Sequence, residues 1–200
     1  MREPANLAAV VALQPDFMGF IFYPKSSRYV GESLQPAVLA QVPAGVQKVG
    51  VFVDEDVQVI KQRIADYGLN LVQLHGHETP ATCATLRAVG VGVIKAFAVG
   101  EELNFVALQD YVSQVDYFLF DTKGAQPGGN GTAFDWQQLE QYNLPVPYFL
   151  AGGLGPEHAE ALRNLRLPGL YALDLNSRFE IAPGVKDAEL LRQMFTDLRT

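Results

Sequence analysis

Short apolar stretches alternate with amphipathic stretches along the whole chain. Seven of them are rich in Val, Ile, Leu and aromatic residues, as is typical of strands covered on both faces of a parallel sheet. We therefore predict seven strands, at Phe17–Tyr23, Lys48–Val53, Leu71–His75, Val93–Ala96, Tyr117–Asp121, Tyr148–Ala151 and Leu170–Leu175.

The stretches around these strands predict helices. In one of them Val57, Ile60 and Ile64 fall on a single helical face, and Pro80 and Pro156 stand in the first turn of two others, where proline is tolerated. Repeated strand–helix units indicate an α/β fold with a parallel sheet, which is either doubly wound and open or a barrel that lacks one strand. Helices are expected at Pro4–Leu13, Asp56–Tyr67, Thr79–Val89, Asp135–Tyr142, Pro156–Leu165 and Asp187–Leu198.

Composition narrows the class of protein. The 200 residues are 48% hydrophobic, which suits one domain spanning 1–200, and the net charge of −7 comes without a basic cluster, which argues against nucleic acid as a partner. No apolar run is long enough to span a membrane, and the N-terminus lacks a signal-peptide core. Cys83 is the single cysteine, so neither an intramolecular disulfide nor a thiolate zinc site is expected. We predict a soluble, cytoplasmic protein.

Polar residues gather where the predicted strands end, the edge that carries the active site in parallel α/β proteins. Asp121 ends an apolar strand, where loss of solvation can raise the pKa of a carboxyl group and make it a general acid. The alternative is an aspartate that caps the following loop. The glycine-rich loop Gly128–Gly131, close behind Asp121, favours a functional role.

Two later loops suggest an anion site. Gly152 and Gly153 lie between a strand end and a helix start, where backbone N–H groups can bind phosphate, and Asn176 and Ser177 follow the next strand. Two consecutive loops of this kind form the phosphate site in many (β/α) barrels. The competing interpretation is a tight turn that needs glycine for its geometry alone.

Other candidate residues have weaker signals. Arg28 can hold a carboxylate through two parallel hydrogen bonds, although composition alone favours a solvated loop cation. His75 and His77 form a weak metal motif, and solvated or loop-bonding histidines are the favoured interpretation. Cys83 falls among small helix residues and is expected to pack there rather than act as a nucleophile.

Taken together and in order, several stretches resemble the phosphoribosylanthranilate isomerases, a family of (β/α)8-barrel (TIM-barrel) enzymes of tryptophan biosynthesis. The matching stretches span almost the whole chain and are Gly19–Tyr29, Val49–Val53, Val72–Gly76, Ile94–Ala96, Phe120–Lys123, Gly128–Trp136, Leu150–Leu154 and Asp174–Ser177.

The resemblance implies an Amadori rearrangement of N-(5-phosphoribosyl)anthranilate to 1-(2-carboxyphenylamino)-1-deoxyribulose 5-phosphate, without a metal or an organic cofactor. A general acid opens the furanose ring and a general base removes the C2 proton. Asp121 matches the family's acid, Arg28 the arginine that binds the anthranilate carboxylate, and His75 a histidine near the site whose role stays open. The phosphate-binding loops of the family match Gly152, Gly153, Asn176 and Ser177.

One part of the family pattern is missing. The family opens with a strand of about seven residues that ends in Lys-x-Cys-Gly-Met or a similar run, and its cysteine is the general base. Met1-Arg2-Glu3-Pro4 resembles the continuation of that motif. We therefore expect a barrel without strand one, impaired turnover, and a gap through which copies of the chain can associate. A start placed at an internal methionine is expected rather than a naturally short chain.

Two other functions stay open at this point. The missing base favours a non-catalytic barrel that binds a sugar phosphate or an anthranilate. A metal-dependent pentose-phosphate epimerase shares the architecture, but it needs His and Asp ligands on several strand ends, and the chain has only three histidines.

Overall fold

The computed structural model describes residues 1–31, 34–100, 104–122 and 135–200. Seven parallel strands pair with one another in the order in which they follow along the chain. The seven predicted strands are confirmed, with small differences at their ends. They are β1 (Phe17–Ile21), β2 (Gln47–Phe52), β3 (Leu71–Leu74), β4 (Gly92–Val99), β5 (Tyr117–Thr122), β6 (Tyr148–Leu150) and β7 (Leu170–Leu173).

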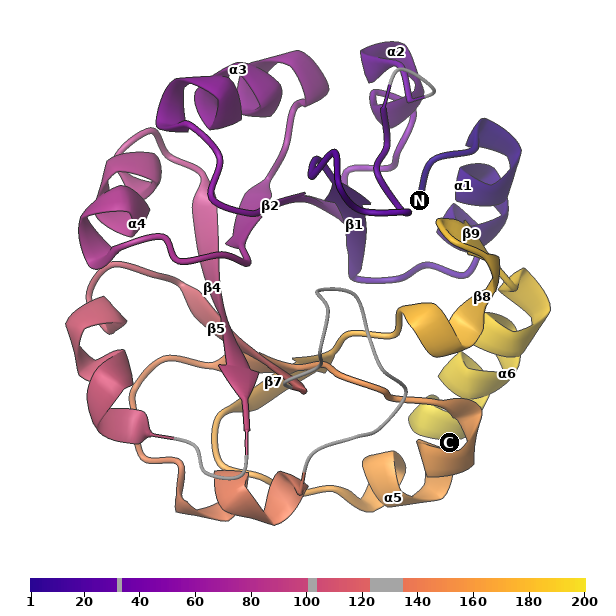
Figure 1. Cartoon of the computed structure of the whole chain (residues 1–200). Coiled ribbons are helices and arrows are strands. Elements are labelled where there is room, and N and C mark those ends of the chain that lie inside the picture. Colours follow the sequence, from indigo (N-terminus) through magenta and orange to yellow (C-terminus); the bar gives the residue numbers. More distant parts are fainter. Residues whose placement is uncertain (32–33, 101–103, 123–134) are drawn as a thin grey trace.

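The strands curl around a central space with the helices on the outside (Figure 1). An open doubly wound sheet would instead carry helices on both faces and reverse its strand order at a switch point. The fold is therefore an α/β barrel of the (β/α) type. Its two edge strands are β1 and β7, and among the described residues no strand pairing joins them.

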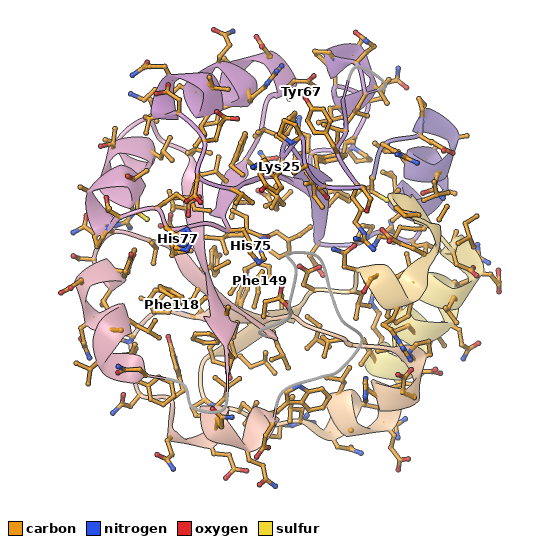
Figure 2. The ribbon with its side chains drawn as sticks, viewed as in Figure 1. Lys25, Tyr67, His75, His77, Phe118 and Phe149 are labelled. Atoms are coloured by element: carbon orange, nitrogen blue, oxygen red, sulfur yellow. The ribbon has the colours of Figure 1, made fainter. Side chains whose placement is uncertain are left out.

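Alternate residues of each strand point into two separate cores. Leu119 of β5 and Phe149 of β6 lie in the interior of the barrel with other buried residues from neighbouring strands. Phe118 and Phe120 of β5 belong to the larger core between the strands and the helices. Figure 2 shows Phe149 inside the ring of strands and Phe118 on the side of the helices. Both faces of the sheet are covered, which explains why the strands read as nearly continuous apolar runs.

The helices begin at capping residues that the sequence supplies. The Asp56 side chain accepts hydrogen bonds from the N–H groups of Gln58 and Val59, and α3 ends at Gly68 with a φ of 57°, a conformation that favours glycine. Thr79 and Asp187 cap two further helices in the same way. The α-helices are α1 (Pro4–Val11), α2 (Pro36–Leu39), α3 (Val57–Tyr67), α4 (Pro80–Arg87), α5 (Ala159–Asn164) and α6 (Ala188–Arg199).

Several connections differ from the prediction. The helix expected at 135–142 is a 3-10 helix, and the one expected at 156–165 is divided between a 3-10 turn and α5. A two-stranded hairpin precedes α6 and was not predicted. The remaining elements are η1 (Phe105–Tyr111), η2 (Trp136–Gln141), η3 (Pro156–His158), η4 (Ser177–Phe179), β8 (Glu180–Ala182) and β9 (Val185–Lys186). Gly128–Gly131 lies outside the described residues.

The side on which β1 and β7 stand apart is covered by the two ends of the chain. Helix α1 packs against α6 and contacts β9 (Figure 1). Met1 is buried, and its backbone nitrogen lies 3.4 Å from the carbonyl oxygen of Gly19 in the middle of β1. The chain thus begins directly beside the edge strand. No helix of the described residues is long and apolar enough to cross a membrane.

Candidate active site

A cavity of about 400 Å³ lies among the carboxyl ends of the strands. It continues between β1 and β7 as far as Asp16, Tyr171 and Arg199 at the opposite end of the barrel. Every residue that the sequence singles out for catalysis or substrate binding lines this cavity. These residues are Arg28, His75, Asp121, Gly152, Gly153, Asn176 and Ser177.

Asp121 and His75 lie next to one another on the wall of the cavity. His75 Nε2 lies 3.4 Å from Asp121 Oδ2, and both side chains are about a quarter exposed. The amide nitrogen of Gln73 lies 2.7 Å from His75 Nδ1. Because an amide nitrogen only donates, Nδ1 accepts this bond and the ring proton is on Nε2, directed at the Asp121 carboxylate. Figure 2 shows His75 towards the centre of the ring of strands.

Asp174 is a site residue that the sequence reasoning missed. It follows β7 and lines the same cavity as Asp121. Burial raises the pKa of its carboxyl group, and repulsion from Asp121 adds to this effect, while the charges of Lys186 and His75 oppose it. Asp174 has the same signal as Asp121, since each carboxylate directly follows or ends an apolar strand. The pattern that identified Asp121 in the sequence could therefore have identified Asp174 as well.

The raised pKa predicts a pH-dependent effect on stability. The folded chain binds a proton at Asp174 more tightly than the unfolded chain does, so protonation of this carboxyl group stabilises the fold. This contribution is fully present below the unfolded pKa of about 4 and is lost as pH rises through the folded pKa. Asn is neutral at every pH. We expect Asp174→Asn to raise the urea midpoint at pH 7 and the gain to shrink towards pH 4. A lower midpoint at pH 7 would show that Lys186 and His75 outweigh the cost of burial.

Arg28 comes from the loop after β1 and is not a solvated cation, so the interpretation that composition favoured is wrong. Its side chain is 14% exposed, and Nε and Nη2 both lie 2.8 Å from Oε2 of Glu180. A buried carboxylate therefore fixes the edge of the guanidinium group formed by Nε and Nη2. Glu180 was not foreseen as a functional residue, because its strand lies in the hairpin that the sequence pattern did not predict.

The two glycines of the β6 loop adopt conformations that other residues rarely take. Gly152 and Gly153 have φ angles of 84° and 68°. Geometry alone therefore requires glycine here, and the phosphate-binding role stays a prediction. Asn176 turns both its carbonyl oxygen and Oδ1 towards Lys186 Nζ, at 2.8 and 2.7 Å. Ser177 opens the 3-10 turn η4 directly after it.

The two remaining candidates, His77 and Cys83, have structural rather than catalytic surroundings. The His77 side chain is 96% exposed and pairs with Asp54, which confirms a solvated, loop-bonding histidine. Cys83 is fully buried in α4, and burial raises the pKa of its thiol to about 11, which confirms a packing role. Among the described residues no group of three or more His, Cys, Asp or Glu side chains is arranged to hold a metal ion.

Comparison with known proteins adds to this geometry. The family model described as N-(5'-phosphoribosyl)anthranilate (PRA) isomerase matches residues 1–197. The chain is 41% identical to the N-(5'-phosphoribosyl)anthranilate isomerase of Parabacteroides distasonis over 99% of its own length and 90% of that protein. It is 43% identical to the isomerase of Paracoccus denitrificans over 96% of its length and 91% of that protein.

Solved structures agree with this assignment. The phosphoribosylanthranilate isomerases of Thermus thermophilus and Thermotoga maritima each superpose with a TM-score of 0.85, at 30% and 31% identity, over 100% of this chain and 95% of theirs. A further isomerase structure, bound to reduced 1-(o-carboxyphenylamino)-1-deoxyribulose 5-phosphate, superposes with a TM-score of 0.81 at 28% identity over the same shares. By its sequence and its fold, this chain belongs to the N-(5'-phosphoribosyl)anthranilate isomerase family.

Proposed function

We propose that the cavity at the carboxyl ends of the strands binds N-(5-phosphoribosyl)anthranilate and supports its rearrangement to 1-(2-carboxyphenylamino)-1-deoxyribulose 5-phosphate in tryptophan biosynthesis, in the cytoplasm. The observation that carries this proposal is the convergence of an acid, a buried arginine and two phosphate-type loops in one cavity of about 400 Å³. Family membership gives the reaction, and the residues of this chain supply an acid and a group suited to each anion of the substrate.

The first chemical step requires a proton at the ring oxygen of the ribose. In the proposed mechanism Asp121 donates this proton, the bond from the ring oxygen to C1 breaks, and a protonated imine forms between C1 and the anthranilate nitrogen. His75 Nε2 lies 3.4 Å from one oxygen of the Asp121 carboxyl group, so its N–H orients this group and leaves the other oxygen to carry the proton. Loss of the C2 proton to a base then gives an enolamine, which tautomerises to the ketone with no net change in atoms.

The substrate has an anion at each end, and the cavity offers a different group for each. The backbone N–H groups of the Gly152–Gly153 and Asn176–Ser177 loops suit a phosphate, which accepts several hydrogen bonds. The planar guanidinium of Arg28 suits a carboxylate. In the proposed mode of binding, these two anchors hold C1 and C2 of the sugar near Asp121, which lines the same cavity.

The step at C2 needs a proton acceptor. Cys83, the single cysteine of the 200 residues, is buried on the helix side of β4 and does not line the cavity. The resemblance assigns the acceptor to a cysteine two positions before the residue that matches Met1. Since Met1 lines the cavity beside β1, a residue two positions earlier would also lie at the edge of the cavity.

The proposed role of Arg28 can be tested on substrate binding. We expect Arg28→Ala to raise KM by about tenfold or more, because a charge-assisted pair with the anthranilate carboxylate would be lost. Arg28→Lys should recover only part of this loss, since an ammonium group lacks the planar pair of donors. The measurement is KM from steady-state kinetics together with the dissociation constant of the reduced product analogue. Unchanged values in both variants would remove Arg28 from the binding site.

A further inference from the structure

Glu180, on the β8–β9 hairpin, is the central residue of a network of buried charged side chains beside the cavity. Its Oε2 accepts hydrogen bonds from two nitrogens of Arg28, both at 2.8 Å. Its Oε1 accepts from the Gly184 N–H at 3.1 Å and from Lys186 Nζ at 3.2 Å. The Glu180 side chain is only 5% exposed. Burial would raise the pKa of Glu180, but the Arg28 hydrogen bonds and the Lys186 charge hold it below its usual value.

Lys186 connects this carboxylate to the second loop of the cavity. Its ammonium group donates to Glu180 Oε1 and to both oxygens of Asn176. The hairpin backbone is itself held in place, because the Lys186 N–H donates to Asn6 Oδ1 and the Lys186 carbonyl accepts from Asn6 Nδ2. The network therefore rests on α1 and on the hairpin rather than on a single side chain.

The contact between Arg28 and Glu180 spans the open side of the barrel. Arg28 follows β1 and Glu180 lies 152 residues later, beyond β7. These are the two strands that no pairing joins among the described residues. The ion pair therefore connects the loop that carries Arg28 to the β7 side of the barrel, and Glu180 holds two nitrogens of the guanidinium there.

The position of Glu180 on the guanidinium also matters for a ligand. Its Oε2 takes the edge formed by Nε and Nη2, which fixes the plane of the group. The edge formed by Nη1 and Nη2 then points away from Glu180 in a set direction. A guanidinium whose plane is fixed beforehand loses less freedom when it pairs with a carboxylate.

We infer that Glu180 is a positioning residue for substrate selectivity: it holds Arg28 in the orientation that binds the anthranilate carboxylate, and through Lys186 it keeps that arginine at a set distance from the Asn176 loop. This inference rests on the proposed function, in which Arg28 binds the carboxylate end and the Asn176 loop the phosphate end. It predicts that Glu180 acts on recognition of the carboxylate and not on binding of the sugar phosphate in general.

Two probes separate these effects. One is reduced 1-(o-carboxyphenylamino)-1-deoxyribulose 5-phosphate, and the other is the same compound without the ring carboxylate. The dissociation constant of the probe without the carboxylate, divided by that of the probe with it, reports how much the carboxylate contributes. Both constants are measured by calorimetry and need no turnover. The variants are Glu180→Gln, Glu180→Asp, Arg28→Ala and the double variant Arg28→Ala with Glu180→Gln. Glu189→Gln is the matched control, because Glu189 pairs with Arg192 on the exposed face of α6.

We expect Glu180→Gln to lower this ratio about tenfold, because binding of the probe with the carboxylate weakens while binding of the other probe hardly changes. Glu180→Asp, which keeps the charge, should lower it less. Glu180→Gln should have no further effect once Arg28 is Ala, and Glu189→Gln should leave the ratio unchanged. If Glu180→Gln does not fold, a lowered ratio in Glu180→Asp carries the same conclusion, and an unchanged one overturns it.

Two results would overturn the inference in distinguishable ways. If Arg28→Ala lowers the ratio but Glu180→Gln weakens both probes equally, Glu180 has a general structural role and the proposed function stands. If Arg28→Ala leaves the ratio unchanged, Arg28 does not bind the carboxylate, and both the proposed role of Arg28 and the inference about Glu180 fail.

Discussion

We expect kcat to rise by about 10²–10⁴-fold when a strand of the family type is added before Met1, with a cysteine two positions before Met1. This is the usual contribution of general-base catalysis, and the comparison is with the 200-residue chain. The geometry supports this result, because the Met1 nitrogen lies beside the Gly19 carbonyl of β1 and Met1 lines the cavity. Residues added before Met1 would continue between β1 and β7. The measurement is the steady-state rate of the two forms.

The control for this prediction is the same extension with alanine in place of the cysteine. It fills the gap between β1 and β7 without supplying a thiolate, so it should raise the urea midpoint as much as the cysteine form does, through pairing of exposed strand edges. Its kcat should stay near that of the 200-residue chain. Equal rates in the alanine and cysteine forms would assign the base to another residue.

Asp121→Asn is expected to have the second large effect. In the cysteine-extended protein it should lower kcat by about 10²-fold or more, because an amide keeps the shape of the carboxyl group but cannot deliver a proton to the ring oxygen. KM and the affinity for the reduced product analogue should change little, since Arg28 and the two loops supply the binding contacts. Rate constants from single-turnover kinetics would separate the chemical step from product release.

Asp110→Asn is the matched control, because Asp110 lies exposed on η1 and is not part of the cavity. It should leave both kcat and KM unchanged. Near-normal kcat in Asp121→Asn would rule out Asp121 as the acid and would make Asp174 the first alternative, because it also lines the cavity and burial raises its pKa.

The strands and the cavity residues could be predicted from the sequence for a physical reason. A strand buried on both faces needs an apolar residue at nearly every position, so runs such as Tyr117–Asp121 are distinct from their surroundings. The carboxyl ends of parallel strands meet at one edge, so polar residues that follow them are brought together. Periodicity alone did not distinguish a barrel from an open sheet, because both have the same strand–helix repeat.

The contacts between distant parts of the chain could not be predicted in this way. Lys95 lies in β4. A lysine would be expected at the surface, yet Lys95 is buried, and its Nζ lies 3.0 Å from Oε2 of Glu78. The pairing of Arg28 with Glu180 joins residues 152 positions apart. The β8–β9 hairpin is short, and Ile181 in it is 71% exposed, so it has no apolar run to reveal it. Each of these depends on tertiary packing rather than on local pattern.

A crystal structure of the chain with reduced 1-(o-carboxyphenylamino)-1-deoxyribulose 5-phosphate tests the central claim most directly. We predict that the phosphate lies at the Gly152–Gly153 and Asn176–Ser177 loops, that the carboxylate pairs with Arg28, and that the sugar lies against Asp121. A ligand bound outside this cavity, or one with its phosphate at Arg28 and its carboxylate at the glycine loop, would contradict the proposed site.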